Sequence, residues 1–333
     1  MRAVPTATHS VTDSPHLPRN LPTDSAQRAL ITILGELLPS DPPVAIPSAA
    51  LVDLLGRVGV SPAAARAALS RMSRRHTLSV TKSGRQSAYR LSTEVAASIP
   101  LSEVLTMGFG SVERKWNGEW TVVVFSLPEA QRDRRQALRE WLRWLGFGPV
   151  RDGVWVSLNA DIELTKRALA ELMPADGLIF RSLDVVGKID AAEVWSLQQI
   201  RQTYEEFVAE FRPYIYDLRA GTVSPADALR LWITVLGKWR GFPTVDPDLP
   251  SQLLPPDWPR PEARRVFEAV HDGCIPMAEL LVRSVVSAHD GESGRCVRGL
   301  TVDAALASYQ KRVPTGDPEV DLAAVGPQRL AHA

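Results

Sequence analysis

The amino-acid sequence predicts an α+β protein of several domains, with an N-terminal winged helix-turn-helix, a middle ferredoxin-like βαββαβ domain and a helical C-terminal domain. Three observations lead to this fold class. Three apolar patterns of helical period precede two alternating, hairpin-like segments within the first 92 residues. Strand-like and helix-like segments then follow in the order β-α-β-β-α-β. From about residue 189 onward the pattern is helical.

The same patterns set the domain boundaries that we expect. The chain has 333 residues, enough for two or three compact domains. Its first 22 residues hold four prolines among small polar residues, without the apolar core of a secretory signal. The expected units are a disordered leader (1–24), the winged helix-turn-helix (25–92), a connecting helix (93–115), the ferredoxin-like domain (116–188), the helical domain (189–313) and a flexible tail (314–333).

The composition is that of an ordinary globular protein, with 45% hydrophobic and 23% charged residues. No apolar run approaches the roughly 18 residues that would span a bilayer. Two cysteines are too few for a disulfide scaffold, so we expect a cytoplasmic protein. The cysteines and their nearest histidines lack the spacing of a common zinc site. We therefore expect buried cysteines, surface histidines, no metal and no other cofactor.

Positive charge is concentrated in one window. The whole chain has 38 basic and 38 acidic residues, but the segment 57–90 holds eight Lys or Arg and no Asp or Glu. The rest of the chain therefore holds 30 basic and 38 acidic residues, a net charge of −8. This asymmetry predicts a local surface for an anionic partner, although basic runs are commonly only solvated faces.

The basic window has the elements of a DNA-reading unit. A first helix is expected over 25–38, a second from about residue 47 to 56, and a third from Pro62, with Ser61 as its cap. Ala65, Leu69 and Met72 form the inward face of this third helix. The opposite face is small and basic, as expected for a helix that enters the major groove. Its predicted DNA contacts are Ser61, Arg66, Ser70 and Arg74, with Arg71 at the edge.

A β-hairpin follows this helix. The segments 78–81 and 87–91 alternate apolar and polar residues around a turn that contains glycine. Lys82 and Arg85 at the tip are expected to lie along phosphates as a wing. The fold itself needs a hairpin here, so only its charge is evidence of function.

The middle segment supplies the ferredoxin-like order. We expect a connecting helix over 93–109 capped by Thr93, strands at 120–127, 149–151, 154–158 and 177–183, and helices at 132–145 and 161–173. Small nucleases of this layout use an acidic metal ligand at the end of the first strand, where this chain has Ser126. Arg135, Arg139 and Arg143 form a helical stripe that could receive ligand phosphates, but nearby acidic residues favour a solvated face.

The C-terminal segment is predicted to be helical over 195–216, 224–236 and 262–288, with a proline-rich connection at 242–259. Ser224 is expected to cap the second of these helices, with Pro225 at its first position. Most of the nine tryptophans lie in this segment and the middle one, where we expect them mainly in the core, with a few around a pocket for an apolar ligand.

These segments resemble the PaaX family, bacterial repressors of aromatic-acid catabolism of the phenylacetate type. The likeness extends over about 25–313 in the family's order. It is carried by ARAALSRM (65–72), GRQSAYRL (84–91), WNGEW (116–120), LPE (127–129), GFG (146–148), GVWV (153–156), DPDLP (246–250) and LLPPDWP (253–259).

The resemblance implies a homodimer that binds a palindromic operator in double-stranded DNA and is released by an acyl-CoA thioester. Where the family tends to have a His-Glu-aromatic-Arg run, this chain has GKWR (237–240), so the ligand is expected to differ if that run contacts it. The candidate effector-binding residues are Arg135, Arg139, Trp239 and Arg240.

Two other classes of function remain open. One is a thioesterase or nuclease-like enzyme with an appended DNA-binding domain, although the Gly-x-Ser-x-Gly motif is absent. The other is a scaffold that uses the winged helix for protein contacts. The residues favour a regulator that is not an enzyme.

Overall fold

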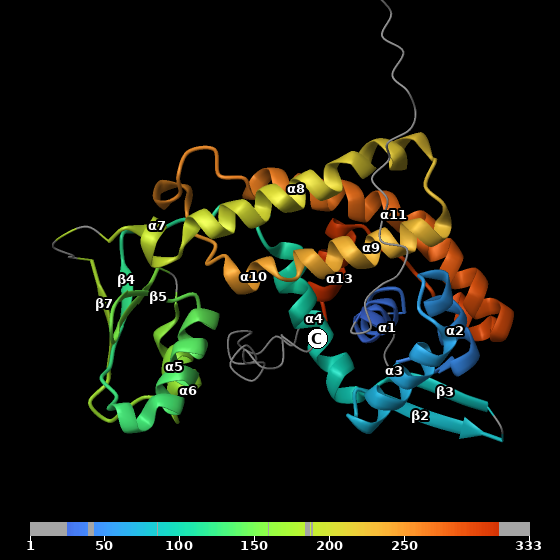
Figure 1. Cartoon of the computed structure of the whole chain (residues 1–333), viewed down its shortest axis with the longest axis horizontal. Coiled ribbons are helices and arrows are strands. Elements are labelled where there is room, and N and C mark those ends of the chain that lie inside the picture. The colour runs from blue at the N-terminus through green and yellow to red at the C-terminus, as the bar shows by residue number, and fades with distance from the viewer. Residues whose placement is uncertain are drawn as a thin grey trace, which may run out of the picture.

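A computed structural model describes residues 25–38, 43–84, 86–158, 160–183, 187 and 189–312. The expected leader (1–24) and the expected tail (314–333) both lie outside the described residues. Figure 1 shows a mixed helix and sheet architecture, in which a sheet-containing middle part lies beside a larger body built from the N-terminal and C-terminal parts.

The N-terminal part contains three helices and a small antiparallel sheet. Its elements are α1 (Ser25–Glu36), β1 (Ile46–Pro47), α2 (Ser48–Arg57), α3 (Pro62–Arg74), β2 (Leu78–Ser83) and β3 (Gln86–Leu91). The strands lie in the order β1-β3-β2. The sequence did not predict β1, because a strand of only two residues is too short to show the alternation of apolar and polar side chains. Ile46 is nevertheless fully buried and pairs with Tyr89, which joins the chain before α2 to the hairpin.

The connecting helix α4 (Thr93–Gly108) leads from the hairpin to the middle part. The predicted cap, Thr93, is wrong by one residue, because the Ser92 hydroxyl accepts the hydrogen bond from the Val95 N–H. α4 packs closely against α13 (Val302–Gln310) near the end of the described chain. Its buried residues all lie from Pro100 onward, whereas Thr93 and Glu94 at its start are exposed, and the helix lies near the centre of Figure 1.

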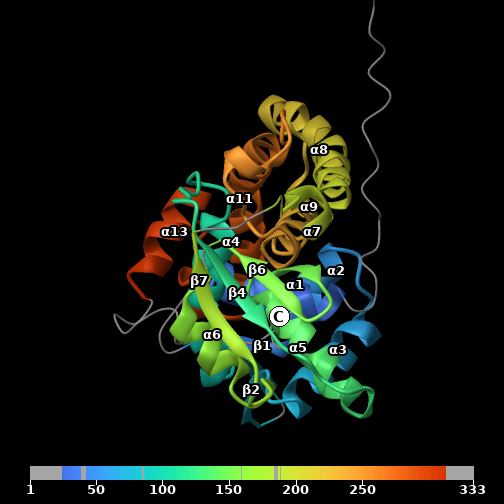
Figure 2. The same ribbon diagram turned by 90° about the vertical axis from the view of Figure 1, so that its left-hand side faces the viewer.

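The middle part is a four-stranded antiparallel sheet in the order β5-β6-β4-β7. Its elements are β4 (Trp120–Val124), η1 (Glu129–Gln131), α5 (Arg132–Trp144), β5 (Gly148–Arg151), β6 (Val154–Ser157), α6 (Ile162–Leu169) and β7 (Leu178–Ser182). Val123, Trp155 and Ile179 face a core with Leu138 and Leu142 of α5. Helices α5 and α6 thus cover one face of the sheet (Figure 2).

Two predicted elements of the middle part end early. The strand expected to reach residue 127 ends at Val124, since its partner β6 begins at Val154 and Gly153 turns the chain away. Gly153 has a φ of +72°, and a Cβ atom there would lie 2.2 Å from the carbonyl oxygen of Phe125. The helix expected to reach residue 173 ends at Leu169.

The C-terminal part is helical. Its further elements are α7 (Ala191–Val194), α8 (Leu197–Ala220), α9 (Pro225–Trp239), α10 (Phe242–Val245), η2 (Ser251–Leu253), α11 (Arg260–His289) and α12 (Gly291–Arg295). Ser224 caps α9 and Pro225 occupies its first position, as predicted. The long helix α11 packs against α8, α9 and α2, so the C-terminal part also supports the N-terminal one. The sequence missed α7, α10, α12 and α13, most of which are too short to show a helical period.

The described helices include none with the length and apolarity to cross a bilayer. Cys274 is buried, as expected, whereas Cys296 is exposed. The expectation of surface histidines is wrong for His271, which is 1% exposed and packs against Trp232 and Phe267. Within the described ranges, no three His, Cys, Asp or Glu side chains gather as metal ligands.

Candidate nucleic-acid interface and central cavity

Helix α3 is fixed by its cap and by its apolar face. The Ser61 hydroxyl accepts a hydrogen bond from the Ala64 N–H at 3.2 Å, which satisfies one of the free donors at the helix start. Ala65, Leu69 and Met72 are buried in the core that α1 and α2 share. The burial of this face determines which side chains point outward.

The outward face of α3 carries the predicted contacts. Arg66, Ser70 and Arg74 are exposed, and Arg71 is half-buried at the edge. Lys82 in the hairpin is also exposed, whereas Arg85 lies outside the described residues.

These cations are available to a partner. Within the part of the chain that the structure describes, Arg66, Arg71, Arg74 and Lys82 have no ion pair or hydrogen-bond partner. Arg57, at the start of the basic window, differs because its Nε lies 3.1 Å from Oδ1 of Asp53. The face is therefore a group of unpaired positive charges on a rigid helix, which suits phosphates and base edges.

The four predicted effector residues do not come together. Arg135 and Arg139 belong to α5, where they bind Glu129 at 2.9 Å and Asp152 at 2.7 Å. Trp239 is fully buried, and its Nε1–H donates to the carbonyl of Thr106 at 3.0 Å. Trp239 therefore supports α4 from the core and does not line the cavity described next. Arg240 does line that cavity.

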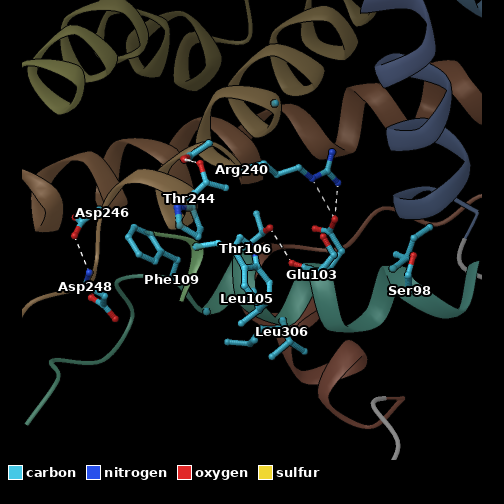
Figure 3. A pocket seen from close by; sticks show the side chains of 18 of the residues that line it. Ser98, Glu103, Leu105, Thr106, Phe109, Arg240, Thr244, Asp246, Asp248 and Leu306 are labelled. Atoms are coloured by element: carbon cyan, nitrogen blue, oxygen red, sulfur yellow. Dashed lines mark hydrogen bonds and ion pairs between the residues drawn. The ribbon is translucent and has the colours of Figure 1, made fainter. Parts of the chain in front are cut away.

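A cavity of about 1610 Å³ lies between α4 and its neighbours. Its walls come from α1, α4, α9, α10 and α13, from the end of α5 and from the 157–165 segment of the middle part. Figure 3 shows side chains of α4 and of the chain from Arg240 to Asp248 converging on it. Apolar side chains from several helices line this cavity, among them Ile31, Ile99, Trp144, Ile233 and Leu306. All three parts of the chain therefore contribute to one hollow.

Arg240 is the centre of a polar network in the cavity wall. Its Nη2 donates to Glu103 Oε1 at 2.6 Å and to Glu36 Oε1 at 2.8 Å, and its Nη1 donates to Thr32 Oγ1 at 2.8 Å. The Tyr309 hydroxyl donates to the second oxygen of Glu36 at 2.9 Å. The network thus joins the C-terminal end of α9 to α1, α4 and α13, and Figure 3 shows the contact between Arg240 and Glu103.

The network holds one more carboxyl group than it has guanidinium groups. Burial, followed by repulsion from Glu103, raises the pKa of Glu36 well above its usual range, and the attraction of Arg240 offsets this only in part. Burial by itself lowers the pKa of Arg240, but the attraction of Glu103 and Glu36 outweighs it and the net change is upward. Glu36 therefore takes up a proton more readily than an exposed glutamate does, and a proton on it would remove the excess negative charge of the network.

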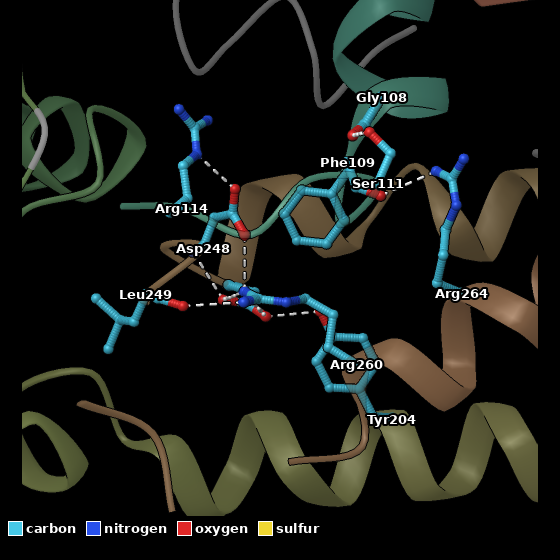
Figure 4. A network of polar contacts seen from close by, with 10 residues as sticks. Gly108, Phe109, Ser111, Arg114, Tyr204, Asp248, Leu249, Arg260 and Arg264 are labelled. Carbon is cyan, nitrogen blue, oxygen red and sulfur yellow. Dashed lines mark hydrogen bonds and ion pairs between the residues drawn. The ribbon is translucent and has the colours of Figure 1, made fainter. Parts of the chain in front are cut away.

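A second buried network fixes the DPDLP segment (Figure 4). Asp246 accepts from the Tyr204 hydroxyl at 2.6 Å and from Arg260 at 3.3 Å. Arg260 also contacts Asp248 at 2.9 Å, and Asp248 binds Arg114 at 2.7 Å. The acidic residues of the segment therefore tie α11 to the linker between α4 and β4.

Sequence reasoning missed Glu36, Glu103 and Arg260. Each lies on a helix that carries other charged residues, and charged residues of helices are ordinarily exposed. The DPDLP segment was recognised as a motif, but its partners are far away in the chain and no local pattern indicates them.

Three family models match consecutive segments of the chain. One described as "PaaX-like protein" matches residues 25–95, one described as "PaaX protein central Cas2-like domain" matches 113–194, and one described as "PaaX-like protein C-terminal domain" matches 195–284.

The chain is also similar to individual known proteins. The Transcriptional repressor PaaX of Escherichia coli (strain K12) is 25% identical over 238 residues, which cover 68% of this chain and 74% of that protein. The structure of the Uncharacterized protein Rv0674 from Mycobacterium tuberculosis matches with a TM-score of 0.55 at 21% identity, over 79% of this chain and 99% of that one. The second likeness shows a shared fold alone.

Proposed function

Because the chain belongs to the PaaX-like protein family, we propose that it is a DNA-binding transcriptional regulator that acts as a repressor and not as an enzyme. The E. coli relative carries the name of a transcriptional repressor, which supports this role. The observation that carries the proposal is the outward face of α3, where Arg66, Arg71 and Arg74 have no partner within the described residues.

The N-terminal part (25–92) is proposed to be a winged helix-turn-helix. The order of its helices, the short turn between α2 and α3, and the hairpin β2–β3 support this assignment. In this arrangement α3 enters the major groove, with Arg66 and Arg71 at base edges and with Ser61, Ser70 and Arg74 near base edges or phosphates. Lys82 and Arg85 lie along the backbone as the wing.

The remaining parts are proposed to form the other predicted domains. For the middle part (116–188) we propose the ferredoxin-like fold. Two features support it, the strand order β5-β6-β4-β7 and the two helices α5 and α6 that follow β4 and β6 in the chain. The connecting segment (93–115) and the helical domain (189–313) complete the proposed organisation. We propose a homodimer, because a palindromic operator mirrors the two-fold symmetry of its reader.

The cavity is the proposed effector site. Its volume exceeds the roughly 300–1,000 Å³ of ordinary small-molecule pockets, which suits an extended ligand such as an acyl-CoA. The target would be an operon for aromatic-acid or related catabolism. A ligand held between α1, α4 and the middle part would change the distance between the two copies of α3 in the proposed dimer. Half-sites lie about 34–36 Å apart, so a small change in dimer geometry would weaken operator binding.

Retardation of the protein's own promoter fragment tests the proposal. Arg66→Ala and Arg71→Ala should each weaken operator binding by about 1–3 kcal/mol if the side chain reads a base, and Lys82→Ala should weaken all sequences similarly. Arg57→Ala is the matched control, because Arg57 belongs to the same basic window but is paired with Asp53. Affinity of the wild type should fall as salt rises.

Equal retardation by wild type and all the α3 and hairpin variants would contradict the assigned DNA face. Retardation of no promoter fragment would favour a scaffold. The enzyme alternative has its own test, in which pure protein is incubated with phenylacetyl-CoA and with DNA. Steady turnover of either would overturn the proposal of a regulator that is not an enzyme.

A further inference from the structure

The chain that follows α12 returns to the N-terminal part. Residues 297–310, which we call the strap, consist of a short extended stretch and the helix α13. Val297, Val302 and Tyr309 of the strap are each 1% exposed. The strap is therefore packed into the molecule, where it lies between the C-terminal part and α1.

One side of the strap is fastened to α11 through backbone atoms. Glu279 accepts a hydrogen bond from the Gly299 N–H at 2.8 Å, and Arg283 donates to the carbonyl of Val297 at 2.7 Å. Glu279 and Arg283 also pair with each other. A Cβ atom at Gly299 would lie 2.6 Å from the side chain of Ile275, so the backbone of the strap lies directly on this helix.

The other side of the strap is bonded to the C-terminal end of α1. The Arg298 N–H donates to the carbonyl of Leu37 at 2.8 Å. The Tyr309 hydroxyl donates to Glu36 at 2.9 Å and lies 3.4 Å from the carbonyl of Gly35. The last carbonyls of a helix have no partner within the helix. Here the strap supplies donors to this end of α1 and joins it to α11.

This contact restricts the orientation of the whole N-terminal part. Helices α1, α2 and α3 share one apolar core, so a rotation of α1 carries α3 with it. The C-terminal part also touches this unit at a second place, where α11 packs against α2 (Figure 1). One contact would leave the unit free to rotate about it, whereas two contacts on different helices fix its angle.

We propose that the strap positions α3 and thereby determines which spacing of operator half-sites the regulator accepts. The inference rests on the proposed function, because it takes α3 as the DNA-reading helix and the protein as a homodimer. Half-sites lie about 34–36 Å apart, so a small rotation of each N-terminal part would move one α3 out of register. Tyr309 is then a positioning residue, which acts on DNA only through α1 and α3.

Two matched double variants test the strap. Tyr309→Phe with Glu279→Ala removes one hydrogen bond on each side of it. The control is Tyr204→Phe with Glu268→Ala. Tyr204 is as buried as Tyr309 and its hydroxyl also donates to a carboxylate, at 2.6 Å. Glu268 pairs with an arginine of α11 four positions away, as Glu279 does. The partners of the two control residues lie in the DPDLP segment and α11.

Mobility-shift titrations of the full-length proteins use three fragments. They are the protein's own promoter with its operator located by footprinting, the same fragment with one base pair inserted between the half-sites, and a single half-site. One base pair adds about 3.4 Å and about 35° of rotation. Wild type and the control should bind the inserted fragment about tenfold more weakly than the natural one.

The strap variant should show a different pattern. It should bind the natural fragment about fivefold more weakly than wild type does, and the insertion should weaken it by at most about twofold, because a loosely held α3 can adjust to either spacing. All three proteins should bind the single half-site equally, since the DNA-reading face is unchanged. A general loss of stability would not relax the dependence on spacing.

Three results would overturn the inference. They are equal affinity of wild type for the two spacings, a strap variant that keeps the wild-type dependence on spacing, and a control that loses this dependence as the strap variant does. The first is read on wild type alone, and half-site binding shows that the DNA-reading part of each variant is folded. Retardation of no fragment by wild type would instead refute the proposed function and the inference together, so the two failures are distinguishable.

Discussion

Replacing Arg240 with methionine is expected to lower the free energy of unfolding by about 3 kcal/mol. The change removes the guanidinium that contacts Glu36, Glu103 and Thr32 but keeps an apolar side chain of similar length. Removing one partner of a buried ion pair typically costs about 3–5 kcal/mol, because the other charge is left uncompensated. The lower end applies here, because Arg240 is 20% exposed and the raised pKa of Glu36 favours its neutral form.

Lys238→Met provides the control on the same helix. Lys238 forms an ion pair with Glu210, but both side chains are far more exposed, at 50% and 41%. A surface pair of this kind contributes about 0.5 kcal/mol or less. The comparison therefore separates the loss of a buried network from the loss of a positive charge on α9.

Urea denaturation at pH 7, followed by far-ultraviolet circular dichroism, measures both variants. The Arg240→Met midpoint should fall well below that of wild type, with a similar slope, whereas Lys238→Met should stay close to wild type. Equal midpoints for the two variants would refute the reasoning, because the network around Glu103 would then contribute no more to stability than an exposed pair.

Two further predictions concern pH and backbone geometry. Burial raises the pKa of Glu36 in the folded protein, so the stability it contributes is present at low pH and is lost as pH rises above the usual carboxyl range. Glu36→Gln should remove this loss. The difference in unfolding free energy from wild type, measured by urea titration at several pH values, should therefore grow as pH rises above the usual carboxyl range, by up to about 1.4 kcal/mol per pH unit. Parallel plots of stability against pH would contradict this prediction. Gly153→Ala should lower the free energy of unfolding by about 2 kcal/mol more than Gly118→Ala in the same assay. Both glycines have a positive φ, but only at Gly153 would the new Cβ atom meet a carbonyl oxygen, that of Phe125, at 2.2 Å. Equal losses would show that the turn relaxes.

The outward face of α3 illustrates what local patterns can predict. Ser61, Pro62 and the apolar spacing of 65, 69 and 72 predict both the start of the helix and its buried side. The structure places Arg66 and Arg74 on the exposed side, as expected from that periodicity. A cap and a helical period involve residues within a few positions of each other, so they are visible in the sequence.

The cavity illustrates what such patterns miss. Arg240 was singled out together with Arg135, Arg139 and Trp239, but only Arg240 lines the hollow. The prediction assigned Trp239 to a ligand, whereas it packs on Phe267 and supports α4. Whether an aromatic residue on an amphipathic helix faces a ligand or a neighbouring helix depends on how the helices pack, which the period alone does not determine.

The sequence by itself determined the order of the longest helices and of the strands β2–β7, the capped helix α3 and the concentration of positive charge in 57–90, because these depend on neighbouring residues. Only the tertiary structure decided which acidic residues surround Arg240. Glu103 and Glu36 lie 137 and 204 positions away in the chain. The two carboxyl groups meet Arg240 because α1 and α4 pack against the end of α9. This packing buries the charged groups together, and a buried charge is stable only beside an opposite charge.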